Sequence, residues 1–435
     1  MSTAPTLSSL NLPLAPRALQ FAPLPRSPED TGLPRVFLLE LIAKHIYSGG
    51  DADLRQLTQL TALSWQTLEI LIAQLRDNTF VEVRKGVEQE LRYALTDKGR
   101  NFAIEALARN AYVGPAPISL AHYVTVVKSQ ATKDLSIDPA SVNAAYHDAV
   151  VSESLLQQIG PAVLSGRPLI FYGEPGTGKT FLAQRLQRLL GGEIFIPYAL
   201  WVNNAIIKVF DASVHEAVPS STHNNSLVQL AQHDTRLVRC KRPAIIVGGE
   251  LTLDMLDLAY DPRSNVYQAP AHLKANNGVF VIDDLGRQRV RPTELLNRWI
   301  IPMEERRDFM TLGSGGRFEV PLEFLMAFST NLNPRDLADD AFLRRIGYKI
   351  KISHLNRDEF HTLWHRVCAS QGVTCNEELF EFLMDELYQP SSVPLTACHA
   401  RDLVGLVMDQ CRFNGEPAAL TQKRLRHAWN NYFLT

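Results

Sequence analysis

The run Pro168-Leu-Ile-Phe-Tyr-Gly-Glu-Pro-Gly-Thr-Gly-Lys-Thr180 decides the fold class of this 435-residue chain. Its first five residues are predicted to form a buried strand, and the residues from Phe181 onward follow a helical pattern. A G-x-x-x-x-G-K-T loop between a strand and a helix is a phosphate-binding motif, because glycines let backbone N–H groups surround the phosphates. The predicted nucleotide-binding residues are Gly173, Glu174, Pro175, Gly176, Thr177, Gly178, Lys179 and Thr180.

Two of these residues have side chains suited to ATP and its metal ion. We expect the Lys179 amine to reach the β- and γ-phosphates and the Thr180 hydroxyl to bind Mg²⁺. The start of the following helix adds partial positive charge where the anion would sit. ATP and Mg²⁺ are therefore the expected cofactors.

A second apolar run, Gly278–Ile282, ends in Asp283 and Asp284. Four consecutive apolar residues indicate a buried parallel strand, and ligand-facing carboxylates belong at its carboxyl end. We expect Asp283 in the magnesium shell, and Asp284 to orient and deprotonate the attacking water.

A third apolar run, Phe324–Thr330, leads directly into Asn331. An amide at this position is suited to hold the attacking water or to touch the γ-phosphate. Arg344 and Arg345 follow at the end of a short helix, where such arginines often act on a neighbouring subunit's nucleotide; the alternative is a solvated helix face. Arg401 begins a later helix and could close over the nucleotide.

Taken in order, these segments resemble an AAA+ ATPase module over about residues 151–435. The resemblance matches the P-loop to Walker A, Asp283-Asp284 to Walker B and Asn331 to sensor 1. It matches Arg344 or Arg345 to the arginine finger and Arg401 to sensor 2. It implies an α/β P-loop NTPase with a C-terminal helical lid, ATP hydrolysis, and a homo-oligomeric ring, expected to be a hexamer.

The residues after Asp284 indicate which group of AAA+ ATPases the chain resembles. A helical run from Leu295 to Arg306 precedes two short strands, Phe309–Leu312 and Arg317–Val320, joined by a glycine-rich tip. This pattern is similar to MoxR-like ATPases and their magnesium-chelatase and enhancer-binding relatives, whose hairpin faces the ring pore. The GAFTGA loop of the enhancer-binding group is absent. The resemblance implies a remodelling motor or chaperone that acts on a protein client.

Two departures from the family pattern stand out. Asp284 stands where the family usually has glutamate, so slow hydrolysis is expected. An alternative function is therefore a scaffold that is controlled by nucleotide binding and scarcely hydrolyses ATP. The distance from Lys179 to Asp283 is long, and we expect an insertion at about 193–243 that elaborates the surface.

The remaining chain divides by composition and periodicity. A Pro/Ser-rich start predicts disorder or an extended strap, and three apolar-periodic helices followed by two strands predict a winged-helix-like domain. The expected units are a tail (1–33), a winged-helix-like domain (34–110), a connector (111–150), an ATPase core (151–352) and a helical lid (353–435).

The winged-helix-like domain is neutral, with ten Lys+Arg and ten Asp+Glu over residues 34–110. Its third helix opens with Trp65, Gln66, Thr67 and Glu69, a poor set for reading base edges. Protein docking is therefore favoured over DNA binding, and a DNA-associated regulator remains the alternative function.

The whole chain carries a formal charge of −2, which gives no electrostatic argument for a nucleic acid or membrane partner. No apolar run is long enough to cross a bilayer. The five cysteines are odd in number and form no CxxC pair, which is typical of reduced packing residues. A cytoplasmic location is expected.

Overall fold

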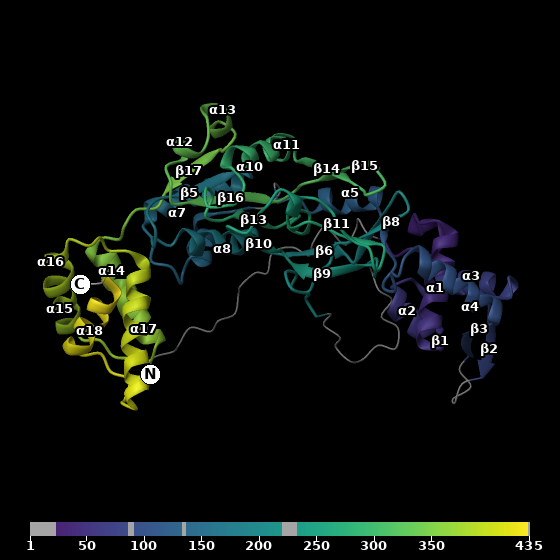
Figure 1. Ribbon diagram of the computed structural model, residues 1–435, viewed down its shortest axis with the longest axis horizontal. Helices are drawn as coiled ribbons and strands as arrows, with labels where there is room; N and C mark the ends of the chain where they lie inside the picture. Colours follow the sequence, from purple (N-terminus) through teal and green to yellow (C-terminus); the bar gives the residue numbers. More distant parts are fainter. Residues whose placement is uncertain (1–22, 86–90, 133–135, 220–232, 434–435) are drawn as a thin grey trace, which may run out of the picture.

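The computed structural model describes residues 23–85, 91–132, 136–219 and 233–433. Figure 1 shows an elongated molecule with a helical lid at one end, an N-terminal domain at the other, and the sheets between them. In the described residues, no helix is long and apolar enough to cross a membrane.

The central sheet has five strands, all paired in parallel, in the order β10-β13-β16-β5-β17. Its members are β5 (Leu169–Tyr172), β10 (Ala244–Val247), β13 (Val279–Ile282), β16 (Leu325–Thr330) and β17 (Tyr348–Lys351). Because the strands are parallel, the segments that follow β5, β13 and β16 meet at one edge of the sheet. This brings together the P-loop, Asp283-Asp284 and Asn331, and it confirms the predicted α/β P-loop NTPase fold class.

Helices cover both faces of this sheet, as buried parallel strands require. The face with Phe171 and Val281 packs against α6 (Pro139–Ala145), α7 (Glu153–Ser165) and α8 (Lys179–Leu190). The face with Phe280 and Phe328 packs around Trp299. The helices on that side are α9 (Ala271–Lys274), α10 (Pro292–Arg298), α11 (Ile300–Glu305), α12 (Pro334–Leu337) and α13 (Asp340–Leu343).

The N-terminal domain has the element order predicted for a winged-helix-like domain. Three helices precede the β2–β3 hairpin, and β1 adds to it as an antiparallel strand in the order β1-β3-β2. The elements are α1 (Arg35–Gly49), β1 (Asp51–Asp53), α2 (Leu54–Thr61), α3 (Trp65–Asp77), β2 (Val81–Lys85), β3 (Leu91–Leu95) and α4 (Asp97–Arg109). Ser64 caps α3 by accepting a hydrogen bond from Thr67 N.

Of the two alternatives for the tail, disorder is wrong for residues 23–33, which pack against the protein as a strap would; residues 1–22 lie outside the described residues. Thr31 and Leu33 are buried against the N-terminal domain. The Thr31 carbonyl accepts a 2.9 Å hydrogen bond from the Arg236 guanidinium, and the Pro25 carbonyl accepts one from Thr67. Proline-rich composition signalled disorder, but these contacts come from distant segments that composition does not reveal.

A second five-stranded sheet lies between the central sheet and the N-terminal domain (Figure 1). Its order is β11-β12-β8-β7-β4, with strands from the expected connector, the expected insertion and the segment after β10. The strands are β4 (Ile118–Ser119), β7 (Ala199–Val202), β8 (Ala205–Lys208), β11 (Ala259–Asp261) and β12 (Val266–Gln268); β6 (Glu193–Pro197) pairs with β9 (Leu237–Lys241) beside it. The expectation of a surface elaboration confined to 193–243 is therefore corrected.

This second sheet is part of the interior. Ala199, Ile206 and Val266 belong to the same buried cluster as the N-terminal helices, and the rings of Phe37 and Trp201 lie 4.2 Å apart. The connector also contributes α5 (Leu120–Ser129), whose Tyr123 is buried against the sheet. The sheet thus joins the N-terminal domain to the ATPase core.

The predicted hairpin is present as β14 (Arg307–Thr311) and β15 (Arg317–Pro321). Met310 and Phe318 on its inner face are buried in the same cluster as residues of the second sheet. At the tip, Gly313 N donates a 2.8 Å hydrogen bond to the Tyr267 hydroxyl on β12. The hairpin expected to face a ring pore therefore has one face and its tip attached to the second sheet, and its exposed side carries Thr311, Arg317 and Glu319.

The lid is a helical unit with its own core. It consists of α14 (Arg357–Ser370), α15 (Glu377–Phe382), a π-helical turn (Leu383–Tyr388), α16 (Gln389–Ser391), α17 (Ala397–Asn414) and α18 (Gln422–Phe433). Helix α17 packs against both α14 and α18, around Trp364, Val404 and Trp429.

Candidate nucleotide-binding site

The P-loop connects the buried strand β5 to α8, which begins at Lys179. Gly173 has a φ of 146°, and a Cβ there would lie 2.2 Å from the Ile352 carbonyl oxygen. Gly176 has a φ of 79°, and a Cβ there would lie 2.6 Å from the Cys398 sulfur. Both positions need glycine because conformation and space each exclude a side chain.

Lys179 is buried inside this loop. Its Nζ donates hydrogen bonds to the Gly173 carbonyl at 3.0 Å and to the Glu174 carbonyl at 2.7 Å. Burial lowers the pKa of the amine, and the nearby carboxylates of Asp284 and Asp283 oppose that effect only in part. An anion bound in the loop would favour the charged amine and could replace these carbonyl contacts.

Thr180 and Asp283 meet at the sheet edge as their predicted roles require. The Thr180 hydroxyl donates a 2.8 Å hydrogen bond to Asp283 Oδ2. The other carboxylate oxygen, Oδ1, is shielded from solvent and has no hydrogen-bond partner among the described residues. A hydroxyl beside a carboxylate with an unsatisfied oxygen is a donor set that fits Mg²⁺.

Asp284 and Asn331 form the second polar pair of the site. Asn331 Nδ2 donates a 3.1 Å hydrogen bond to Asp284 Oδ1, which orients the carboxylate. Asp284 has a φ of 48°, in the left-handed region that Asp and Asn enter more readily than most residues. The strand end thus turns sharply and presents this carboxylate beside the loop.

Lys179, Thr180, Asp284 and Asn331 line one cavity of about 1070 Å³. Its wall includes the P-loop, Asp284, Asn331 and the segments 148–155 and 351–355, and the lid closes another side with Ala397, Cys398 and Arg401. A volume of this size accommodates a nucleotide. The predicted sensor residue Arg401 is therefore brought to the site; its side chain is 75% exposed and pairs only with Asp402 at 3.2 Å among the described residues.

The lid also contacts the P-loop through two residues that the sequence did not single out. Cys398 N donates a 3.2 Å hydrogen bond to the Gly176 carbonyl, and His354 Nε2 lies 3.1 Å from Glu174 Oε2. Neither residue belongs to a recognisable motif. Their roles depend on how the lid packs on the core, which local sequence does not encode.

A third missed residue is Asp148, at the end of the connector. It forms ion pairs with Arg185 at 2.7 Å and Arg188 at 2.8 Å on α8. These guanidinium groups hold the pKa of the Asp148 carboxyl well below its ordinary value. The connector is thereby fixed against the helix that begins at Lys179.

The structure does not place Arg344 and Arg345 in this cavity. Arg345 is tied to Glu304 at 2.7 Å and to the Ala341 carbonyl at 2.9 Å. Arg344 is exposed, has no side-chain partner among the described residues, and lies at a separate cavity of about 380 Å³ beside Lys349. An arginine outside its own chain's cavity, with no polar side-chain partner among the residues that the structure describes, is suited to reach a neighbouring copy.

Comparison with known proteins gives low similarities. A family model described as a domain of unknown function (DUF8689) matches residues 356–431, which lie in the lid. No curated protein matches the chain.

Similar solved structures include NtrX from Brucella abortus, at 13% identity over 63% of this chain and 53% of that chain, with a TM-score of 0.39. The Holliday junction branch migration motor RuvB from Thermotoga maritima has 13% identity over 67% and 68%, with a TM-score of 0.35. Domain III of the Thermotoga maritima replication initiation protein DnaA has 12% identity over 68% and 98%, with a TM-score of 0.36. The chain spans about half of the NtrX chain. Because these TM-scores are low, the fold class rests on the strand order of this chain itself.

Proposed function

We propose that this chain is an AAA+ ATPase of the MoxR-like kind, which binds Mg²⁺-ATP in the cavity and uses its hydrolysis to remodel a protein partner. The observation that carries the proposal is that Lys179, Thr180 and the Asp284–Asn331 pair line one cavity, while Asp283 is hydrogen-bonded to Thr180 directly beside it. These are the groups that phosphoryl transfer to water requires.

Each pair has a distinct task in this proposal. The P-loop amides and Lys179 hold the phosphates, and Thr180 with Asp283 supplies the ligands for Mg²⁺, which would neutralise charge on the β- and γ-phosphate oxygens. Asp284 accepts the proton of the attacking water, and Asn331 fixes the carboxylate in the orientation that this transfer needs. Arg401 contributes positive charge from the lid.

The proposal includes a ring of identical subunits, because neither Arg344 nor Arg345 lines the cavity of its own chain. Arg344 is the better candidate, since Arg345 is engaged by Glu304 within the same chain. A finger from Arg344 would let one subunit complete the site of the next, and a hexamer is the expected ring.

A protein partner is favoured over DNA by the surface of the N-terminal domain. Arg84 is paired with Glu82, and Arg92 with Asp51, so much of the charge near the wing is already neutralised. Helix α3 exposes Trp65 and Ile70, at 50% and 41%, which suits an apolar contact better than a phosphate backbone.

Steady-state ATP hydrolysis across protein concentration tests the proposal, with Lys179→Ala, Arg344→Ala and Arg345→Ala variants. We expect turnover per subunit to rise with concentration, to vanish in Lys179→Ala, and to fall much further in Arg344→Ala than in Arg345→Ala. ATP binding without turnover in the wild type would contradict the motor and favour the nucleotide-gated scaffold. Salt-sensitive DNA binding that depends on residues 34–110 would instead favour the DNA-associated regulator.

A further inference from the structure

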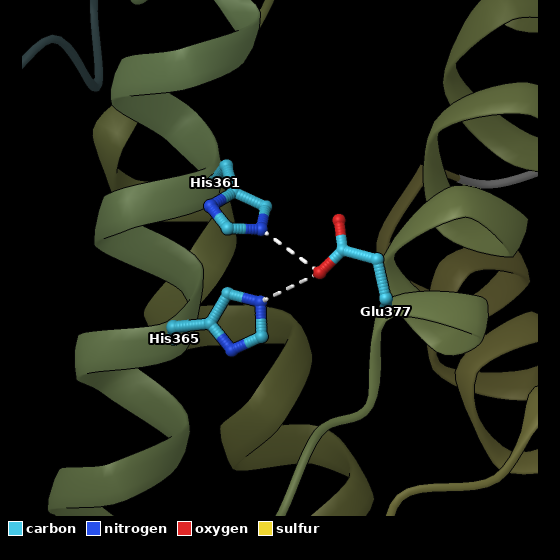
Figure 2. Close-up of side chains that lie close together, drawn as sticks. All are labelled: His361, His365 and Glu377. Carbon is cyan, nitrogen blue, oxygen red and sulfur yellow. Dashed lines mark hydrogen bonds and ion pairs between the residues drawn. The ribbon is translucent and has the colours of Figure 1, made fainter.

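A second cluster of metal-binding side chains lies in the lid, away from the nucleotide cavity. His361 and His365 are four residues apart on α14, and Glu377 is the first residue of α15. Figure 2 shows both imidazole rings pointing from α14 toward the same oxygen of the Glu377 carboxylate. One ligand atom of each residue lies within 4.8 Å of the others.

We propose that His361, His365 and Glu377 bind a divalent transition-metal ion, with Zn²⁺ the best fit. Two histidines at positions i and i+4 of one helix present their nitrogens on one face, as helix-borne zinc sites require. Two imidazole nitrogens and one carboxylate oxygen are ligands that Zn²⁺ prefers over Mg²⁺ or Ca²⁺. Glu377 is 62% exposed, so water can reach a fourth position.

The distances are close to those of a tetrahedral site. With metal–ligand bonds of about 2.05 Å, neighbouring ligand atoms of a tetrahedron are separated by about 3.3 Å. His361 Nε2 and His365 Nε2 lie 3.1 Å and 3.8 Å from Glu377 Oε2. Shifts of about half an ångström, within the reach of side-chain rotation, bring each histidine nitrogen to that spacing from Glu377 Oε2. The ligand atoms of His361 and His365 lie within 4.8 Å of each other.

The environment of His365 Nε2 is an independent observation that favours a cation between the histidine and Glu377. Its Nε2 is shielded from solvent and has no hydrogen-bond partner among the described residues. A proton on this nitrogen would be too far from Glu377 Oε2 for a hydrogen bond, and a lone pair there would face a negatively charged oxygen. A metal ion between the two atoms satisfies both.

A bound ion would fix α14 to α15 beside the nucleotide cavity. The opposite side of α14 lines that cavity with Glu359, Leu363 and Arg366. The Arg366 guanidinium also donates 3.2 Å hydrogen bonds to the carbonyls of His147 and Ala149, next to the connector residue Asp148. Metal binding would thereby stiffen the lid wall, a role that does not depend on the proposed ATPase activity.

The test is direct metal binding by the full, untagged and metal-stripped chain without nucleotide. Zn²⁺ would be titrated in competition with a chromophoric chelator, and Co²⁺ by its visible absorption. We expect one tight equivalent in the wild type, a loss of at least about 100-fold in affinity in a His361→Ala/His365→Ala double variant, and a weaker site in Glu377→Gln. His427→Ala, on α18 outside the cluster, is the matched control and should bind as the wild type does.

Circular dichroism of the metal-free variants would establish that they are folded; if the double variant is not, Glu377→Gln carries the test because that side chain is exposed. Undiminished tight binding in the folded variants would overturn the proposal. So would an equivalent that is lost in Asp283→Asn and kept in the double variant, because the ion would then sit in the nucleotide cavity. Absence of tight binding to the wild type would also overturn it and leave His361 and Glu377 as a hydrogen-bonded pair.

Discussion

At the scale of single residues, the carboxylate of Asp284 is the group on which hydrolysis depends in our proposal. It lines the cavity and is oriented by Asn331. We expect Asp284→Asn to lower kcat by about 10²–10⁴-fold, because an amide cannot accept the proton of water, while nucleotide affinity changes little. Parallel measurement of kcat and of nucleotide binding checks this, with Asp409→Asn on the exposed surface of α17 as control. A matched loss of affinity would show that Asp284 holds the nucleotide rather than the water.

Lys44 gives a residue-scale expectation for stability. It is fully buried in α1, and its Nζ donates hydrogen bonds to the carbonyl and the side-chain oxygen of Asn110. Burial lowers the pKa of the amine from 10.5 to about 8. Below about pH 8 the amine is charged in both the folded and the unfolded chain, so the folded state carries the full cost of burying the charge.

Between about pH 8 and 10.5 the folded chain releases this proton while the unfolded chain keeps it, so stability should rise with pH. We expect the free energy of unfolding of the wild type to increase relative to that of Lys44→Met across this window. Urea unfolding of the two proteins at matched pH values measures the difference between their free energies of unfolding. The other titrating groups are the same in both proteins, so their contributions largely cancel. A difference that stays constant or falls would contradict the assignment.

At the scale of elements, the β14–β15 hairpin packs on the second sheet, which in turn packs on the N-terminal domain. A displacement of the hairpin could therefore be transmitted to that domain. Met310 is fully buried in the shared cluster. We expect Met310→Ala to lower stability by about 2–5 kcal/mol and to loosen the hairpin, because it leaves a cavity between the two sheets. Thr311→Ala, on the exposed face, should be close to neutral.

Hydrogen exchange of the hairpin and of β12, together with ATP affinity, measures the effect of Met310→Ala. Faster exchange in both strands with unchanged nucleotide affinity is expected. Exchange that rises in the hairpin alone would mean that the sheet does not depend on this attachment.

The limits of sequence-based prediction are also clearest at this scale. The P-loop, the strand ending in Asp283-Asp284, the strand before Asn331 and the hairpin were predicted correctly because each is encoded by a continuous run of residues. The second sheet was not predicted, because its strands β4, β7 and β12 come from segments far apart in the chain. In addition, strands of two to four residues carry a weak periodic signal. The contacts of His354 and Cys398 with the P-loop were missed for the same reason, since they depend on how the lid packs.

At the scale of the whole molecule, the lid and the N-terminal domain lie at opposite ends, with the two sheets between them (Figure 1). The lid touches the P-loop through Cys398. Arg236, fully buried with Asp234, donates hydrogen bonds to the Thr31 carbonyl, just before α1, and to the Pro117 carbonyl, just before β4 of the second sheet. Under the proposed function, a nucleotide-dependent movement of the lid would reach the rest of the molecule through these contacts. Arg344, on the outside of that body, is the residue through which one copy would act on the next.

Mixing two inactive variants tests this arrangement between copies. Lys179→Ala should fail to bind ATP but still present Arg344, whereas Arg344→Ala should bind ATP but lack the finger. If Arg344 acts in trans, mixed rings contain sites with an intact P-loop facing an intact Arg344, so we expect a substantial part of the ATPase activity to return on mixing. Mixing Lys179→Ala with Asp284→Asn is the matched control, because both changes disable residues of the same chain's cavity and no mixed site is complete. Activity that stays absent in the first mixture, with subunit exchange verified, would mean that Arg344 does not serve a neighbouring site.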